Sequence, residues 1–131
     1  NALGQNEEAI QMYKEVLTIR RSLFGKNHSD TADAMNNIAM VMDDLGQKEE
    51  ALDMYKDVLT IYESLFGKNH ASRANTMKNM VSALYDLDRK EEALQLLREA
   101  LAVLESTLGP DHPSTAATRQ IVTVIADEIE K

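Results

Sequence analysis

Three histidines recur at a fixed interval, and histidine is a side chain that binds metals and moves protons near neutral pH. They are His28, His70 and His112, each 42 residues from the next. If every 42-residue segment folds as one pair of helices, equivalent residues lie roughly 20 Å apart. The three side chains are then too distant to share a metal ion. We expect them to have a structural role instead, such as capping the helix that follows each one.

Paired carboxylates recur at the same interval, as Glu7–Glu8, Glu49–Glu50 and Glu91–Glu92. In an enzyme, one of two adjacent carboxyl groups can act as a general acid and the other as a general base. Here each pair stands at the start of a predicted helix, where the helix dipole favours negative charge. The sequence contains no cysteine, no glycine-rich phosphate loop and no His-Glu-x-x-His pattern. We therefore predict no catalytic residue, no metal site and no cofactor, so that the protein is not an enzyme.

The composition narrows the class of partner. The chain has 131 residues and a formal net charge of −8, which disfavours binding to a phosphate backbone. No apolar run approaches the ~20 residues that span a bilayer, so we predict neither nucleic-acid nor membrane binding. The absence of cysteine fits a reducing compartment, and we expect a cytoplasmic protein. The sequence opens at Asn1 in the middle of a pattern, so we expect a piece of a longer protein.

The 42-residue interval extends along the whole chain. Residues 4–28 and 46–70 are identical at 19 of 25 positions, and a looser third copy runs from Asp88 to His112. Apolar residues in each copy are spaced by three and four, which predicts an amphipathic helix ending at Gly25, Gly67 or Gly109. We name this the B helix. The first B helix is predicted from Glu7, with Gly4 breaking it from residues 1–3, the last turn of an earlier helix.

A second type of helix, the A helix, follows each of those glycines. The predicted A helices are Asp30–Leu45, about residues 72–87, and a last one with Pro113 in its first turn. Ser29 or Asp30 is the expected N-cap of the first. The predicted organisation is one array with a partial repeat at 1–25, repeats at 29–67 and 71–109, and a final A helix at 113–131. The fold class is all-α, with short links that make neighbouring helices antiparallel.

Small and aromatic residues at fixed places resemble the tetratricopeptide repeat: Ala39, Gly46, Ala51 and Tyr55, with Gly4, Ala9 and Tyr13 in the preceding copy. The 42-residue period, the link Leu-Gly-Pro-Asp-His-Pro at 108–113 and the run Asn-Asn-Ile-Ala at 36–39 resemble the kinesin light chain type. The resemblance implies a right-handed α-solenoid of antiparallel helix pairs. It also implies a non-catalytic scaffold that binds an extended peptide or helix in a concave groove, as in cargo or adaptor recognition.

In this family the A helices line the concave groove. Residues 29–45 and 71–87, which hold the first two A helices, agree at only 5 of 17 positions, as a groove that reads an asymmetric peptide would require. The positions expected to face the groove vary between acid, amide, base and apolar. They are Asp33, Asn36, Asn37, Met40, Asp43 and Asp44; then Asn75, Lys78, Asn79, Ser82, Tyr85 and Asp86; and last Ala117, Gln120, Ile121, Val124, Asp127 and Glu128.

The charge of these positions decides between ligands. The basic clamp for chaperone tails is missing, since amide or apolar residues stand at its positions. Lys78 is the one base among these positions, which include Asp43, Asp44, Asp86, Asp127 and Glu128. An acidic peptide is therefore repelled and a partner with basic and apolar residues is favoured. The alternative is a structural spacer or a self-associating segment without a peptide ligand. Apolar residues around the last helix should remain exposed in part, which suggests a homo-oligomer formed through the end helices.

Overall fold

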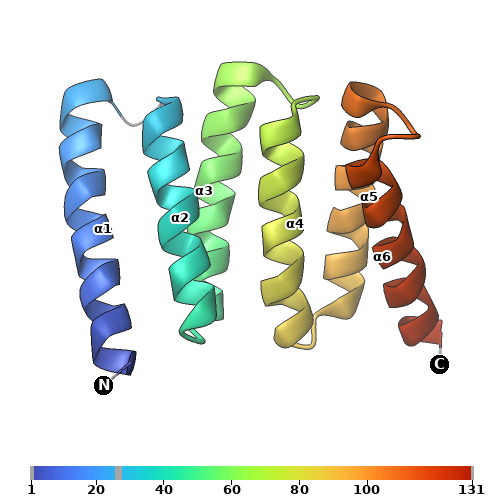
Figure 1. Ribbon diagram of the computed structural model, residues 1–131, viewed down its shortest axis with the longest axis horizontal. Helices are drawn as coiled ribbons and strands as arrows, with labels where there is room; N and C mark the ends of the chain where they lie inside the picture. The colour runs from blue at the N-terminus through green and yellow to red at the C-terminus, as the bar shows by residue number, and fades with distance from the viewer. Residues whose placement is uncertain (1, 26–27, 131) are drawn as a thin grey trace. The chain divides into compact units, whose positions relative to one another are not determined.

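The structure, a computed structural model, describes residues 2–25 and 28–130, and short links connect its helices (Figure 1). Within these residues the elements follow the predicted alternation of B and A helices. They are α1 (Ala2–Phe24), α2 (Ser29–Asp44), α3 (Lys48–Phe66), α4 (Ala71–Asp86), α5 (Lys90–Leu108) and α6 (Pro113–Glu130). The B helices are therefore α1, α3 and α5, and the A helices are α2, α4 and α6.

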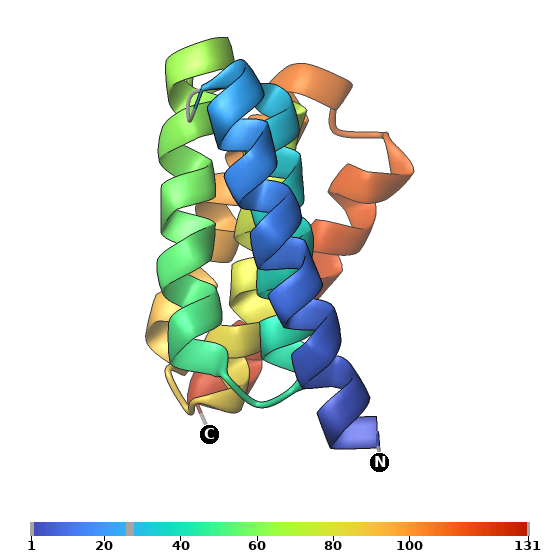
Figure 2. The same ribbon diagram turned by 90° about the vertical axis from the view of Figure 1, so that its left-hand side faces the viewer.

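The chain forms two compact units, residues Asn1–Leu65 and Phe66–Lys131. In the first unit α1 packs on α2, and the Tyr62 hydroxyl of α3 donates a hydrogen bond to Asp33 of α2. In the second unit α5 packs against both α4 and α6. Within each unit, helices that follow one another run in opposite directions, as the short links require (Figure 2). The predicted antiparallel helix pairs are thus confirmed.

Glycine ends the B helices as predicted. The helices α1, α3 and α5 stop at the residue before Gly25, Gly67 and Gly109, whose φ angles are 83°, 83° and 90°. In this region of φ a side chain is strained and glycine is not. Because the glycine closes each helix, the chain can turn directly into the link that leads to the next A helix.

Each histidine caps the A helix that follows it. Nδ1 of His28 accepts a hydrogen bond from the backbone N–H of Asp30 at 3.0 Å, and His70 and His112 make the same bond two residues ahead at 3.1 Å. The predicted capping role is confirmed. The expected N-cap at Ser29 or Asp30 is wrong, because α2 already begins at Ser29 and the imidazole takes the place of a short polar side chain. Pro113 is the first residue of α6, as predicted.

The positions predicted to be small lie in the core. Ala39, Ala51 and its counterpart Ala93 are fully buried, and so is Tyr55. In the second unit Leu97 takes the place of Tyr55 and is equally buried. Burial raises the pKa of the Tyr55 phenol, and the charges of two nearby aspartates, 43 and 44, act in the same direction. The side chains of Ala9 and Tyr13 lie outside the described residues.

The predicted break at Gly4 is wrong, because α1 is one helix from Ala2 to Phe24. Glycine within a helix costs only about 0.5–1 kcal/mol relative to alanine, so it forces a turn only where other contacts hold one. At Gly46 such a contact exists, because the Lys48 Nζ lies 2.6 Å from Asp43 Oδ1 across the turn. In the first copy the equivalent residues are Asn6 and Asn1, which cannot form an ion pair.

None of the helices in the described part of the chain has the length and apolar character needed to cross a membrane.

Candidate peptide-binding groove

The second unit holds a hollow between its two A helices. It has a volume of about 360 Å³ and lies between α4 and α6. Seven residues predicted to face the groove line it: Lys78, Ser82, Tyr85, Asp86, Ile121, Val124 and Glu128. On each helix these residues are three or four positions apart, so they share one face. The structure therefore brings together residues from two A helices that the sequence comparison could place only on separate helices.

The floor of this hollow is apolar. Val81 and Ile125 are buried, while Ile121 and Val124 remain 41% and 55% exposed. The partial exposure expected around the last helix is thus confirmed. Val81 and Ile125 were not among the groove predictions, although they lie next to predicted positions, and their side chains form the base on which an apolar ligand side chain could rest.

The edge of the hollow is polar and carries more negative than positive charge. The Tyr85 hydroxyl donates a hydrogen bond to Glu128 Oε2 at 2.5 Å, which raises the pKa of Tyr85, and the charges of Glu128 and Asp86 act in the same direction. Lys90 of α5 lies over the Tyr85 ring, with Nζ 5.4 Å from the ring centre. The phenol is thereby held between α5 and α6, with two carboxylates beside it. Lys78 is the single cation among the lining residues.

Five predicted groove residues of this unit lie outside the hollow. Asn75, Ala117, Gln120 and Asp127 are exposed and Asn79 is half-buried, and none of the five lines it. On α4, Asn75 comes before the first lining residue, Lys78, and Asn79 lies between lining residues, so the hollow takes up only part of the predicted stripe. These amides remain available to pair with the backbone of a longer ligand.

In the first unit, the predicted residues of α2 are exposed in part. Asn37, Met40 and Asp44 are exposed, and the Asn36 amide lies 3.9 Å from the Met40 sulfur. Met40 is 44% exposed, which is high for a large apolar side chain. The stripe on α2 thus combines an exposed apolar side chain with amides and an acid.

Two predicted acids of α2 are held by side chains of α3. Asp33 accepts the hydrogen bond from Tyr62, and Asp43 pairs with Lys48. Burial raises the pKa of Tyr62, and the hydrogen bond to Asp33 raises it further. Both acids therefore contribute to the packing of α2 on α3. The sequence comparison could not find Tyr62 as a partner, because it is 29 residues from Asp33 and the third copy has Leu104 there.

Two family models described as tetratricopeptide repeat match the chain, one over residues 1–64 and the other over residues 73–114. The comparison with curated proteins finds no match.

Solved structures with a similar fold come from proteins related to kinesin light chains. Nearly identical TPR-like repeats of a Podosopora anserina protein assigned as a kinesin light chain superpose with a TM-score of 0.80 at 24% identity, covering 93% of this chain and 58% of that one. BtubC (BKLC) from P. vanneervenii gives a TM-score of 0.82 at 21% identity, covering 95% of this chain and 49% of that one. The chain thus spans about half the length of these relatives. It belongs to the tetratricopeptide repeat family, and its repeats have the fold of the kinesin light chain type.

Proposed function

We propose that this chain, a tetratricopeptide repeat scaffold for protein–protein interaction, binds an extended peptide or a helix along its A helices. The hollow between α4 and α6 receives part of that ligand. The observation that carries the proposal is that seven predicted groove residues from the two helices α4 and α6 line one hollow. Two of them, Tyr85 and Glu128, are 43 positions apart and joined by a hydrogen bond.

The chemistry of the hollow favours one kind of peptide. An apolar ligand side chain would cover Ile121 and Val124 and remove their exposed surface from water, at roughly 25 cal/mol per Å². A lysine or arginine next to that apolar residue in the ligand would lie beside the carboxylates of Asp86 and Glu128. Lys78 is the one cation in the lining that would oppose it. The proposed ligand therefore carries basic and apolar residues side by side.

The proposal includes the wider role of the chain. A non-catalytic adaptor that recognises cargo proteins fits the repeat family, and the lack of cysteine agrees with a cytoplasmic location. Residues 1–131 are proposed to belong to one continuous array within a longer protein. The competing function is a structural spacer, in which the A helices pack against neighbouring repeats and bind no peptide.

The test is a matched pair of substitutions in the second unit. Ile121 and Leu108 are 41% and 40% exposed, but only Ile121 lines the hollow. The wild-type chain and the variants Ile121→Glu and Leu108→Glu are applied to an array of synthetic peptides in which lysine or arginine neighbours leucine, isoleucine or phenylalanine. Acidic peptides containing tryptophan are included for comparison. We expect Ile121→Glu to weaken binding to basic–apolar peptides at least about tenfold, since it places a charge on an apolar floor.

Leu108→Glu should bind as the wild type does. Equal binding by both variants would show that the hollow is not the site, and an array on which no peptide binds the wild-type chain would favour the spacer.

A further inference from the structure

The charged side chains that line the hollow between α4 and α6 lie at opposite ends of it. Lys78 lines it from the middle of α4, and Asp86 is the last residue of that helix. The two residues are eight positions apart in the sequence. A helix rises about 1.5 Å per residue, so they are separated by about 12 Å along its axis. Glu128 of α6 lies at the Asp86 end, because it accepts the hydrogen bond of Tyr85.

The ends of the two helices reinforce the negative charge of that end. Both α4 and α6 run antiparallel to α5, so their last turns lie on the same side of the unit (Figure 1). The negative ends of both helix dipoles therefore add to the carboxylates. Lys90 of α5 lies nearby, but its Nζ is held over the Tyr85 ring and it does not line the hollow. The hollow thus has one basic end and one acidic end.

The part of the hollow between these two ends is apolar. Val124 of α6 is 55% exposed and lines the hollow together with the buried Val81 and Ile125. The counterpart of Val124 in α4 is Ser82, which stands one turn after Lys78 and one turn before the end of the helix. The bond between Tyr85 and Glu128 indicates that equivalent positions of the two helices lie at similar levels. A ligand side chain that covers Val124 would therefore lie between the cation and the carboxylates.

The basic and the acidic end differ in how often they occur among the repeats. At the position of Lys78 the other two A helices have amides, Asn36 and Gln120. At the position of Asp86 all three A helices have a carboxylate. A basic ligand residue therefore meets an acid on every A helix, whereas an acidic one meets a cation at Lys78 alone. An acidic residue in the ligand would consequently fix the position of the ligand along the A helices.

We propose that the hollow binds a segment of a partner protein in which an apolar residue separates an acidic residue from a basic one. The acidic residue lies beside Lys78, the apolar residue covers Val124, and the basic residue lies beside Asp86 and Glu128. The inference rests on the peptide binding proposed above and adds the order of charges that the ligand carries.

The length of the hollow also determines the spacing of these charges in the ligand. An extended chain advances about 3.3 Å per residue, so its acidic and basic residues would be about three or four positions apart. A helical ligand advances about 1.5 Å per residue and would need about seven or eight. The spacing that binds more tightly therefore reports the conformation of the bound segment.

The order of charges is tested with peptides of identical composition. In the ordered peptide a leucine lies between a glutamate and a lysine, while in its isomer both charged residues stand on the same side of the leucine. The peptides are made with both spacings and in both chain directions, with acetylated and amidated ends that carry no charge. Fluorescence anisotropy at low salt should show the wild-type chain binding one ordered peptide about three- to fivefold more tightly than its isomer.

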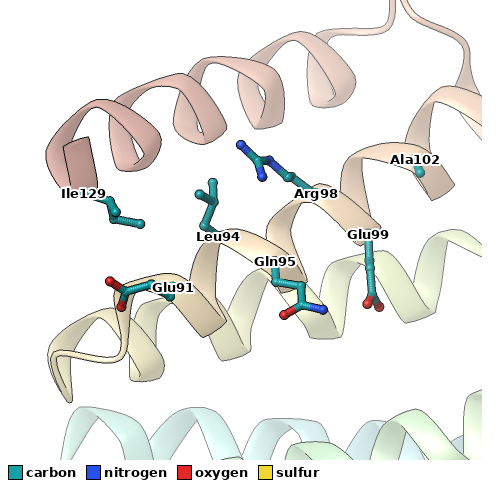
Figure 3. A pocket seen from close by; sticks show the side chains of 7 residues that line it. All are labelled: Glu91, Leu94, Gln95, Arg98, Glu99, Ala102 and Ile129. Atoms are coloured by element: carbon teal, nitrogen blue, oxygen red, sulfur yellow. The ribbon is translucent and has the colours of Figure 1, made fainter.

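A double-mutant cycle tests whether Lys78 is the partner of the acidic residue. Lys78→Gln in the chain and glutamate→glutamine in the ordered peptide should each weaken binding about three- to fivefold, and both together little more than one alone. The matched control is Arg98→Gln, which removes the same charge from the other hollow of this unit. Figure 3 shows Arg98 between Glu91 and Glu99 along α5, without a separation of charges. The effect of this change should be independent of the change in the peptide.

The outcomes separate this inference from the proposed function. Equal binding of the ordered peptide and its isomer, or independent effects of Lys78→Gln and the peptide change, would overturn the order of charges. The hollow would still be a peptide site if Ile121→Glu weakened binding of both peptides. If no peptide of either pattern bound the wild-type chain, the order of charges and the peptide-binding function would both be refuted.

Discussion

At the scale of single residues, an imidazole replaces the usual short cap at the start of each A helix. Nδ1 reaches the N–H two residues ahead in all three links, at 3.0–3.1 Å. Removing this acceptor in His112→Ala should lower the free energy of unfolding by about 1 kcal/mol, since an unsatisfied N–H remains at the helix start. His112→Asn should restore most of it. Urea unfolding of the three chains measures both effects, and equal stabilities would contradict the capping role.

A buried phenol gives the first unit a dependence on alkaline pH. The Tyr62 pKa is raised by burial and by Asp33, so the folded chain holds this proton at pH values where the unfolded chain loses it. The stabilisation is therefore complete below about pH 10, the unfolded value, and is lost progressively as pH rises further. Tyr62→Phe should have a shallower loss of melting temperature above pH 10 than the wild type.

Some loss of melting temperature above pH 10 should remain in Tyr62→Phe, because burial also raises the pKa of Tyr55. At pH 7 Tyr62→Phe should itself cost about 1.5–3 kcal/mol, since it removes a hydrogen bond to a carboxylate. Identical pH profiles for the two chains would argue against the Tyr62–Asp33 bond.

At the scale of the element, the two A–B turns share one backbone path but not one residue type. Gly46 has a φ of 86° and Asp88, at the equivalent position, a φ of 60°. The same pair of hydrogen bonds closes both turns, from N–H groups 46 and 47 in one and 88 and 89 in the other. Asp88→Gly should therefore stabilise the chain by about 0.5–1 kcal/mol, because glycine adopts this φ without strain. The reverse change, Gly46→Asp, should destabilise the chain. Thermal melting of both variants measures these effects, and an unchanged melting temperature in either variant would contradict the prediction for it.

The packing of the B helices allows no additional volume at one position. Ala93 of α5 and its counterpart Ala51 of α3 are fully buried, whereas Ala102 of α5 is exposed. Ala93→Leu should cost about 1–3 kcal/mol through overpacking. The same change at Ala102 should stay within about 0.5 kcal/mol, as surface substitutions usually do. If differential calorimetry found equal melting temperatures for the two variants, the close approach of helices at Ala93 would be refuted, and with it the same expectation for Ala51→Leu.

At the scale of the whole molecule, the period of 42 residues was enough to predict the order of the helices and the glycines that end the B helices, because glycine, proline and apolar spacing act locally. The family resemblance placed most of the residues that line the hollow on α4 and α6. The pairs Tyr62–Asp33 and Tyr85–Glu128 could not be predicted, since they join residues 29 and 43 positions apart and depend on how helices pack. The continuity of α1 through Gly4 was missed for a local reason, because the first copy has asparagines at both positions of the Lys48–Asp43 ion pair that spans the Gly46 turn.

In the proposed peptide binding, the net negative charge of the molecule acts through the acids on the A helices. Asp44 is exposed on α2 and Asp86 lines the hollow of the second unit, so reversing both to lysine changes the predicted groove. Asp43 is left unchanged, because its ion pair with Lys48 holds the turn. Binding of a basic–apolar peptide should weaken several-fold at low salt and the loss should shrink at high salt, as expected for exposed charges.

The control reverses Asp57 and Glu105, exposed acids of B helices, and gives the same net charge. Fluorescence anisotropy of the labelled peptide measures its affinity for the two variants. An equal loss of affinity in both would mean that the total charge attracts the peptide and that the groove does not bind it specifically.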